Sequence, residues 1–552
     1  MLLFIVVCGV ILACYAWALI VVDPQQPIWW TRQVLLLCLV VAAIAGRSLV
    51  GFHPVTRPKH PIWHPALPYF LIVLAAILPY MPSLRVGFLS DDFGLAWAAR
   101  EADSALDAMT SEAFISFFRP IPLLLWWIGD RVWHGNSLGY HVLSLLVHTV
   151  NSILVFLLGR RLIGSVLGGL LAALVFAIHP LHIEPVTWLA ANSDLLCTSF
   201  CLASLLALER RLATNTTRFA GILASLTFFI LALFSKEAAF ALPAIAILRL
   251  ALDERPGIRA RLRTVGGAYL VVLLAYGAFR FSILRGIGGY SLPLSFWNTV
   301  FPSQPLLVIG DFFFPIHTTL FSHEFNRWLQ YVIAGLMAAA GLWWMIALHR
   351  VPGRRLWLWL GFLFLASVPT WLFRWQGSAA LEWSRFAYLP TIGLCWLFGD
   401  LYAARGQNRR GAFPAFVILV GLIVLTLWYQ TPWIRATRLA NETIAAGVSL
   451  VTQLTTSAGP PSLYVADLPQ EIHGAPVFAN CYPQALNLAT GQFITTQVVS
   501  ERPRAGIHPD VMAATPLRPG EYLVSWDAQK GDLRIIRTGT SRSALISPEE
   551  MP

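Results

Sequence analysis

Two adjacent acidic residues, Asp91 and Asp92, follow an apolar run at residues 67–84 that is long enough to cross a bilayer. A charge beside a membrane span is costly unless it is paired, hydrated or functional. Two such carboxylates can share a proton, bind a metal ion or divide the roles of general base and substrate ligand. We therefore predict that Asp91 and Asp92 are catalytic, the alternative being a solvated start of a loop.

Several cationic side chains sit at the edges of other apolar runs. Arg119, Lys236 and Arg385 are of this kind, and Tyr388 follows the last of them. An arginine fork donates two hydrogen bonds to a phosphate at once. We expect these four residues to bind the phosphate of a donor. The alternatives are anchoring at the lipid headgroups and, for Lys236, neutralisation by Glu237.

Three potential ligands lie close together in the segment 179–184, namely His179, His182 and Glu184. Prolines within and just after this segment exclude a continuous helix. The spacing is not that of a standard zinc site. We expect these three side chains, together with Glu237, to form a polar wall of the active site, with metal binding as the alternative.

The composition is that of an integral membrane protein. Hydrophobic residues make up 57% of the chain and charged residues 12%, against roughly 25% charged residues in soluble domains. The formal net charge of +11 comes from arginines in short loops between apolar runs, so membrane topology explains it better than binding to nucleic acid does.

Apolar runs of the length needed for a membrane helix, about 17–25 residues, recur along the chain. We expect an all-α polytopic membrane protein with about 13 transmembrane helices. The predicted spans are residues 1–22, 33–49, 67–84, 141–158, 163–178, 186–208, 219–234, 238–252, 265–281, 328–348, 356–373, 386–402 and 413–429.

Basic residues collect on alternate loops, which predicts that those loops are cytoplasmic. The acidic pair, the 179–184 segment and the C-terminal tail then face the other side. The basic clusters lie at residues 57–59, 160–161, 210–218, 255–263, 350–355 and 405–410.

The chain divides into three predicted parts. Residues 1–66 carry two additional N-terminal helices and a cytoplasmic loop. Residues 67–430 form the catalytic membrane domain, whose long, aromatic first external loop, residues 87–139, is typical of helices lying in the membrane interface. Residues 431–552 are expected to form a small external β-rich domain that helps to recognise the acceptor or to assemble a complex. Its predicted strands are residues 463–466, 476–479, 493–499, 521–526 and 532–537.

Taken in order, these motifs resemble the membrane part of the transmembrane-and-tetratricopeptide-repeat O-mannosyltransferases. They resemble, more distantly, the protein O-mannosyltransferases and other GT-C glycosyltransferases. The resemblance extends over about residues 67–429. It rests on Asp91-Asp92, Phe118-Arg119-Pro120, the segments 140–148 and 179–194, Ser235-Lys236-Glu237 and the segment 385–390.

Individual motifs of that family fall on particular residues of this chain. The acidic motif of the first external loop falls on Asp91 and Asp92, and its Arg-Pro pair falls on Arg119 and the next residue. A late Arg-Tyr-x-Tyr-Leu-Pro motif falls on residues 385–390, where Phe386 replaces the first tyrosine. The chain departs from the family in two ways: it has two extra spans before the acidic loop, and it lacks the family's repeats after the last span. The second departure leaves the acceptor open, because in the family the repeats lie outside the membrane and could present it.

The resemblance implies a GT-C-like fold and an inverting glycosyl transfer. The donor would be mannose, or another hexose or pentose, on a polyprenyl phosphate, and the acceptor a hydroxyl group on protein, glycan or lipid. Asp91 would take the acceptor proton, and Arg385 would neutralise the departing phosphate with help from Arg119 or Lys236. No cofactor is required for this chemistry, and a divalent metal at Asp91 and Asp92 is the open alternative.

Two other classes of function compete with this one. A lipid-linked sugar flippase or transporter would place its charges near the midplane of repeated halves. A polysaccharide polymerase or ligase would share the outward-facing arginines but would not account for the acidic loop. The sequence contains no glycine-rich phosphate loop, so a cytosolic nucleotide donor is not expected. We predict a multi-pass protein of a bacterial inner membrane, in contact with membrane lipids, whose site faces the periplasm or the outside.

Overall fold

A computed structural model gives the architecture. It describes residues 64–111, 117–214, 219–253, 257–286, 288, 308, 311–312, 315, 351–370, 383–404, 409–457, 459–500 and 507–539. The predicted spans at residues 1–22, 33–49 and 328–348 lie outside this described part.

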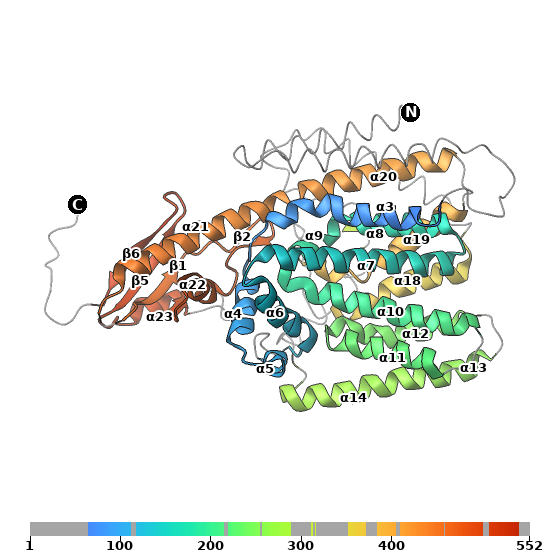
Figure 1. Ribbon diagram of the computed structural model, residues 1–552, viewed down its shortest axis with the longest axis horizontal. Helices are drawn as coiled ribbons and strands as arrows, with labels where there is room; N and C mark the ends of the chain where they lie inside the picture. Colours follow the sequence, from blue (N-terminus) through green and yellow to red (C-terminus); the bar gives the residue numbers. More distant parts are fainter. Residues whose placement is uncertain are drawn as a thin grey trace.

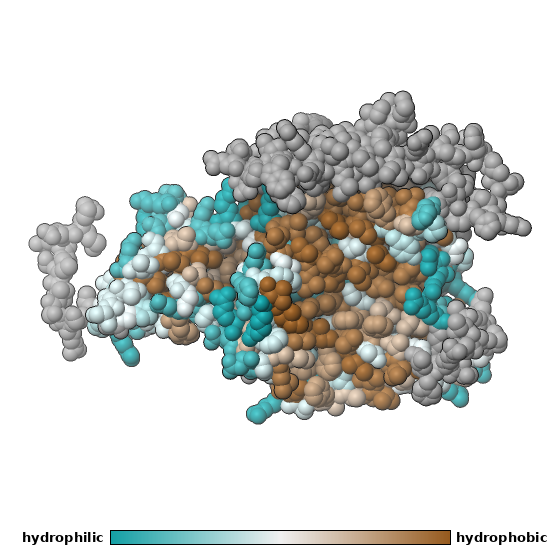
Figure 2. Space-filling model, in the orientation of Figure 1, coloured by the Kyte–Doolittle hydropathy of each residue, from teal (hydrophilic) through white to brown (hydrophobic). Residues whose placement is uncertain are grey.

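Most of the described chain forms a bundle of helices that run along a common direction (Figure 1). Apolar side chains cover much of the visible face of this bundle (Figure 2), as expected of helices that contact lipid. The helices are α3 (Leu67–Ile77), η1 (Leu78–Arg85), α7 (Ser137–Ile163), α8 (Val166–Ile178), α10 (Asn192–Thr214), α11 (Phe219–Leu233), α12 (Leu242–Ala251), α13 (Ile258–Arg261), η5 (Leu262–Gly266), α14 (Gly267–Leu284), α18 (Gly353–Ser367), η9 (Val368–Thr370), α19 (Thr391–Ala404) and α20 (Arg409–Trp428).

Among the described residues, five helices are long and apolar enough to cross a membrane, and six if one pair bent by 55° counts as a single span. They are Leu67–Arg85, Ser137–Ile163, Leu189–Arg210, Ile258–Leu284 and Ala412–Leu454, with the bent pair Val166–Ile178 and Pro180–Thr187. These coincide with six predicted spans. The chain is a multi-pass membrane protein.

Four other predicted spans form shorter helices than the sequence suggested. The helices α11, α12, α18 and α19 have 15, 10, 15 and 14 residues. Polar or proline-containing segments interrupt the apolar runs: α11 ends before Ser235-Lys236, and α12 begins with a proline in its first turn. The predicted number of about 13 spans is therefore supported only in part.

The described residues of the first external loop form mainly helices, as predicted. It contains α4 (Asp91–Glu101), α5 (Ala105–Thr110) and α6 (Pro120–Trp133). Ser104 caps α5 by accepting a hydrogen bond from the Asp107 amide. Figure 1 shows these helices gathered at one end of the bundle, whereas α13 lies at the opposite end.

The C-terminal part begins with a helix that the sequence analysis missed, α21 (Thr431–Leu454). Its buried residues recur every three or four positions, as in Trp433, Ala436, Ala440, Thr443 and Gly447, which is the helical period. In Figure 1, α20 and α21 together extend from the bundle to the C-terminal sheet.

The C-terminal part contains four of the predicted strands in a mixed sheet, together with helices that the prediction of a β-rich domain did not include. The strand order of this sheet is β4-β1-β5-β6, with β4, β1 and β5 parallel and β6 antiparallel to β5. Parallel neighbours need crossover connections, and helices supply them. The elements are β1 (Ser462–Ala466), β2 (Glu471–Ile472), β3 (Ala475–Pro476), α22 (Tyr482–Thr490), β4 (Thr496–Val498), α23 (Pro509–Ala514), β5 (Glu521–Asp527) and β6 (Asp532–Thr538).

Candidate active site

The acidic loop lies where η1 ends and α4 begins. Both acids are in the first turn of α4, where a carboxylate is stabilised by the helix dipole. The residue before them, Ser90, has φ +48° and ψ −115°, a backbone conformation that residues other than glycine rarely adopt. The loop therefore depends on contacts from elsewhere in the chain to hold this turn.

Asp92 is buried, with 1% of its surface exposed. Its Oδ2 accepts a hydrogen bond from the Leu89 amide at 3.0 Å, and its Oδ1 accepts one from the Ala190 amide at 2.6 Å. Burial raises the pKa of the Asp92 carboxyl well above its ordinary value. With both oxygens bound to backbone amides, the geometry gives Asp92 a role in holding the loop against the segment at Ala190.

Asp91 is placed differently, because it keeps part of its surface exposed. Its Oδ1 accepts a hydrogen bond from Asn480 Nδ2 at 2.8 Å. Burial raises the pKa of the Asp91 carboxyl, and the Asn480 amide and the charges of Arg385 and Arg119 partly oppose this rise. A partly exposed carboxylate with a raised pKa has the properties required of a general base.

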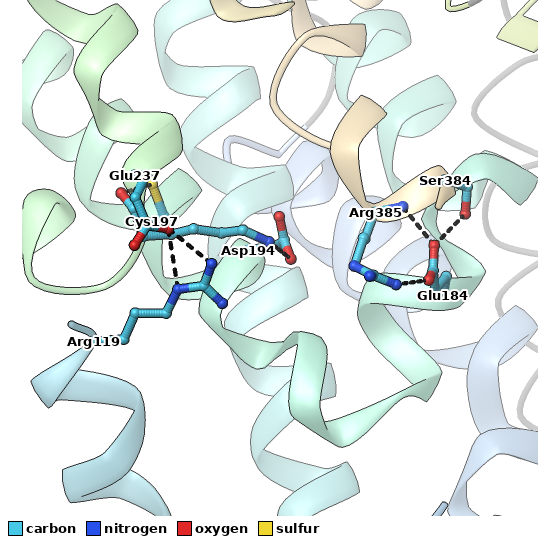
Figure 3. Close-up of polar contacts among 8 residues, drawn as sticks. Arg119, Glu184, Asp194, Cys197, Glu237, Ser384 and Arg385 are labelled. Atoms are coloured by element: carbon cyan, nitrogen blue, oxygen red, sulfur yellow. Dashed lines mark hydrogen bonds and ion pairs between the residues drawn. The ribbon is translucent and has the colours of Figure 1, made fainter. Parts of the chain in front are cut away.

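Arg385 forms an ion pair with Glu184. One guanidinium nitrogen of Arg385 contacts Glu184 Oε1, and the Arg385 amide donates to Glu184 Oε2 at 2.8 Å. Ser384 Oγ lies 3.4 Å from the same oxygen. Figure 3 draws these contacts, which join α9 (Ile183–Thr187) to η10 (Ser384–Ala387). The predicted wall residue Glu184 and the predicted phosphate ligand Arg385 are thus direct partners.

Lys236 pairs with Asp194. Its Nζ contacts Asp194 Oδ2, and both side chains are more than nine-tenths buried. The break between α11 and η4 (Glu237–Ala241) leaves Lys236 in an extended conformation, from which it reaches the first turn of α10. Sequence reasoning identified the lysine but not its acidic partner.

Glu237 is held between two arginines. Its Oε2 accepts from Arg119 Nη2 at 2.8 Å and its Oε1 from Arg280 Nη1 at 2.8 Å. Figure 3 shows the first of these pairs. Arg119 immediately precedes the first helical residue of α6, a proline, a position where proline is favoured and fixes how the chain enters the helix. Glu237 was predicted as a wall residue, and Arg280 was not identified from the sequence.

Trp188 links the acidic loop to the cationic residues. Its Nε1 donates to the Leu89 carbonyl at 3.2 Å, and the Arg385 guanidinium carbon lies 4.8 Å from the Trp188 ring centroid. The Phe386 ring continues this arrangement, with Arg385 and Lys236 at 4.9 and 5.0 Å from its centroid. Arginine binds aromatic faces by cation–π attraction. The acidic loop and two of the predicted phosphate ligands therefore form one continuous cluster.

His179, His182 and Tyr388 are the remaining predicted site residues. All three are fully buried. The Tyr388 hydroxyl lies 2.8 Å from His148 Nδ1, and it accepts a hydrogen bond from Asn151 Nδ2 at 3.2 Å. These contacts favour a role for Tyr388 in helix packing over the predicted contact with phosphate.

The rings of His182 and His179 form hydrogen bonds within the bundle. His182 contacts the Phe176 carbonyl at 2.7 Å and Thr391 Oγ1 at 2.9 Å, and His179 Nε2 lies 3.0 Å from the Phe312 carbonyl. Over the described residues, no group of three or more His, Cys, Asp or Glu side chains is arranged to hold a metal ion. With both Asp92 oxygens bound to amides, the acidic pair is a poor fit to a metal site.

Residues that sequence reasoning missed come from three separate segments: Trp188 and Asp194, Arg280, and Asn480. The first two fall within residues 179–194, a segment that the resemblance had marked as a whole. Nothing in the local sequence around Arg280 or Asn480 distinguishes them, because their partners lie 43 and 389 residues away.

Comparison with known proteins finds a family match in the centre of the chain. Residues 119–279 match the family described as dolichyl-phosphate-mannose-protein mannosyltransferase. This segment contains Arg119, Glu184, Lys236 and Glu237, whereas Asp91 and the residues after 279 lie outside it.

Two relatives are protein O-mannosyl-transferases. Tmtc1 of Drosophila melanogaster is 31% identical over 143 residues, which is 24% of this chain and 17% of that one. TMTC4 of Mus musculus is 24% identical over 373 residues, 56% of this chain and 50% of that one. The chain thus matches half or less of the length of these relatives.

Two solved structures are also similar. The oligosaccharyltransferase AglB of Archaeoglobus fulgidus, in complex with an inhibitory peptide and a dolichol-phosphate, has a TM-score of 0.44 and 15% identity, with 78% of this chain and 63% of that one covered. ArnT of Cupriavidus metallidurans, bound to undecaprenyl phosphate, has a TM-score of 0.45 and 13% identity, with 83% and 93% covered. Residues 119–279 of this membrane protein are thus similar to the family described as dolichyl-phosphate-mannose-protein mannosyltransferase.

Proposed function

We propose that this protein is a GT-C-type glycosyltransferase that moves a sugar from a polyprenyl phosphate to a hydroxyl acceptor at the non-cytoplasmic face of the membrane. The observation that carries the proposal is the joining of the acidic loop to Arg385 through Trp188. A general base and a cation for the leaving group are thereby available in one cluster, which inverting transfer requires.

In this mechanism Asp91 accepts the proton of the acceptor hydroxyl as its oxygen attacks the anomeric carbon. The bond from that carbon to the phosphate oxygen breaks, and the polyprenyl phosphate leaves with the electron pair. Arg385, Lys236 and Arg119 meet the negative charge that develops on the phosphate. A dry, preorganised set of donors is effective at this step because it need not reorganise.

The ion pairs support this role for the cations. Four cations, the three predicted ones and Arg280, face three carboxylates, those of Glu184, Asp194 and Glu237. The carboxylates hold each cation in place, since an unpaired buried charge would be strongly unfavourable.

Donor consumption tests the proposal without knowledge of the acceptor. The purified protein, reconstituted in liposomes, is given polyprenyl phosphates carrying mannose, glucose or a pentose, together with a fraction of surface proteins and glycans. We expect release of polyprenyl phosphate from one of these donors and a matching mass increase on an acceptor. Translocation of an intact donor across the bilayer would instead identify a flippase and overturn the proposal.

A further inference from the structure

The segment just before α22 lies against the acidic loop, although the two are about 390 residues apart in the sequence. The Ser90 amide donates to the Val477 carbonyl at 2.9 Å, and the Asn480 amide donates to Ser90 Oγ at 3.2 Å. The Asn480 side chain then donates to Asp91 Oδ1 at 2.8 Å. Three hydrogen bonds thus connect the C-terminal part to Ser90, which precedes α4, and to Asp91, the first residue of α4.

Side-chain packing reinforces this contact. The Phe93 and Phe478 rings stack with centroids 5.9 Å apart and an interplanar angle of 24°. Behind them α4 and α22 approach closely at a glycine: a Cβ placed on Gly94 would lie 2.7 Å from Cys481 Sγ. Only glycine permits this approach without displacement, so a specific fit joins the two helices.

These bonds fall on the residue that needs support. The positive φ of Ser90 sets the direction in which α4 begins at Asp91. Backbone strain of this kind persists only where surrounding contacts fix it. Both polar groups of Ser90 that are available for this purpose, its amide and its hydroxyl, are bound by the C-terminal segment.

We propose that the C-terminal unit completes the active site, and that Asn480 is a positioning residue that fixes the Asp91 carboxylate for the acceptor hydroxyl. The inference rests on the proposed function. It changes the expectation from the sequence, in which the tail serves recognition of the acceptor and the membrane part alone holds the catalytic residues. An acceptor must then reach Asp91 at the junction between the C-terminal unit and α4.

The amide of Asn480 has two effects on Asp91. It restricts the rotation of the carboxylate, and it favours the ionised form, which is the form that can accept a proton. Other charged or titratable groups act on the same carboxylate: Arg385 from η10, Arg119 at the start of α6, Asp92 next in the chain and the thiol of Cys481, the residue before α22. Loss of Asn480 should therefore raise the pKa of Asp91. Arg385 and Arg119 would still lower this pKa and so limit the rise.

The pH profile of kcat/KM tests this role. Activity needs ionised Asp91, so it rises with pH through the pKa of that group, and a raised pKa moves this acid limb to higher pH. We expect Asn480→Ala to shift the acid limb to higher pH. At a fixed pH on that limb, kcat/KM should fall about tenfold, which is the change for a shift of one pKa unit. The loss should be smaller at high pH. Asn480→Asp should move it further, because a second carboxylate would then face Asp91.

Two further variants separate positioning from folding. Asn441→Ala, at an exposed site on α21, should leave the pH profile unchanged. Gly94→Ala would place a methyl group 2.7 Å from Cys481 Sγ and force that thiol, next to Asn480 in the chain, to shift. It should move the acid limb in the same direction as Asn480→Ala does. The rate at which Cys481 reacts with a neutral maleimide, measured by mass spectrometry of its peptide, reports directly on the seating of α22. It should rise in Gly94→Ala and change little in Asn480→Ala.

The outcomes distinguish the inference from the function on which it rests. An active wild-type enzyme whose pH profile is the same in Asn480→Ala overturns the role of Asn480 and leaves the proposed function standing. A loss by the same factor at every pH, accompanied by faster labelling of Cys481, shows a structural role only and also overturns it. A wild-type protein that consumes no donor at any pH refutes the proposed function, and the inference fails with it.

Discussion

The guanidinium carbon of Arg385 lies 4.8 Å from the ring centroid of Trp188, whose indole N–H donates to the carbonyl that precedes the acidic loop. A lysine at position 385 would keep the charge but lose the planar fork and the stacking. We expect Arg385→Lys to lower kcat about tenfold to a hundredfold, near the low end for loss of one transition-state donor. Steady-state kinetics of donor consumption would measure this, with Arg534→Lys, a pair with Asp527 at the surface, as the control. Equal kcat in both variants would exclude Arg385 from the leaving-group site.

Asp91 is the predicted general base. Asparagine keeps the shape of the side chain and can still contact Asn480, but it cannot take a proton. We expect Asp91→Asn to lower turnover at least about a hundredfold, the low end for loss of a general base, with an unchanged melting temperature. Near-normal transfer by the purified variant would remove Asp91 from the mechanism.

Asp92 should behave in the opposite way. Its two oxygens accept backbone hydrogen bonds in a buried site, so Asp92→Asn would set an NH₂ group against one of these amides. An unsatisfied buried donor costs about 1–3 kcal/mol. We expect a lower free energy of unfolding, measured by thermal or denaturant unfolding in detergent, whereas Asp103→Asn at an exposed site should have no effect. A stable but inactive Asp92→Asn protein would instead indicate a chemical role.

Tyr388→Phe distinguishes two roles for the tyrosine. If its hydroxyl serves His148 and Asn151, removing it should lower stability by about 1–3 kcal/mol and leave the KM for the donor within about threefold. If it contacts phosphate, as predicted from the sequence, the KM should rise while stability is preserved. Unfolding curves and donor kinetics on the same preparation decide between these results.

The orientation in the membrane can be tested by cysteine labelling. Basic loops predict that α13 is cytoplasmic, and Figure 1 places it at the end of the bundle opposite to α4 and the C-terminal sheet. Cysteines introduced at the exposed positions Asp103 and Ser457 should react with an impermeant thiol reagent added from outside, and one at Ala260 should not. The unsubstituted protein gives the background labelling. The reverse pattern would put the acidic loop in the cytoplasm and contradict the proposed donor.

Local sequence was sufficient for much of the fold. The five long helices and the bent pair of the described chain follow from apolar length. Four of the predicted strands coincide with β1, β4, β5 and β6, because alternating runs between turn residues are local signals. Local signals failed where two patterns compete. The amphipathic helix α21 lies in a tail rich in β-like runs. The helices that connect the parallel strands of the sheet were missed in the same tail.

The sequence by itself determined that the chain is a multi-pass membrane protein, and it predicted the acidic loop and the cations as candidate site residues. Only the tertiary structure decided how these groups pair: Arg119 with Glu237, Lys236 with Asp194, Arg385 with Glu184 and Asp91 with Asn480, at separations of 118, 42, 201 and 389 residues. Periodicity and composition report on a residue's neighbours within a few turns of chain. Which charge meets which across the bundle depends on how the helices pack and on where the C-terminal unit meets α4, and no local pattern encodes that contact.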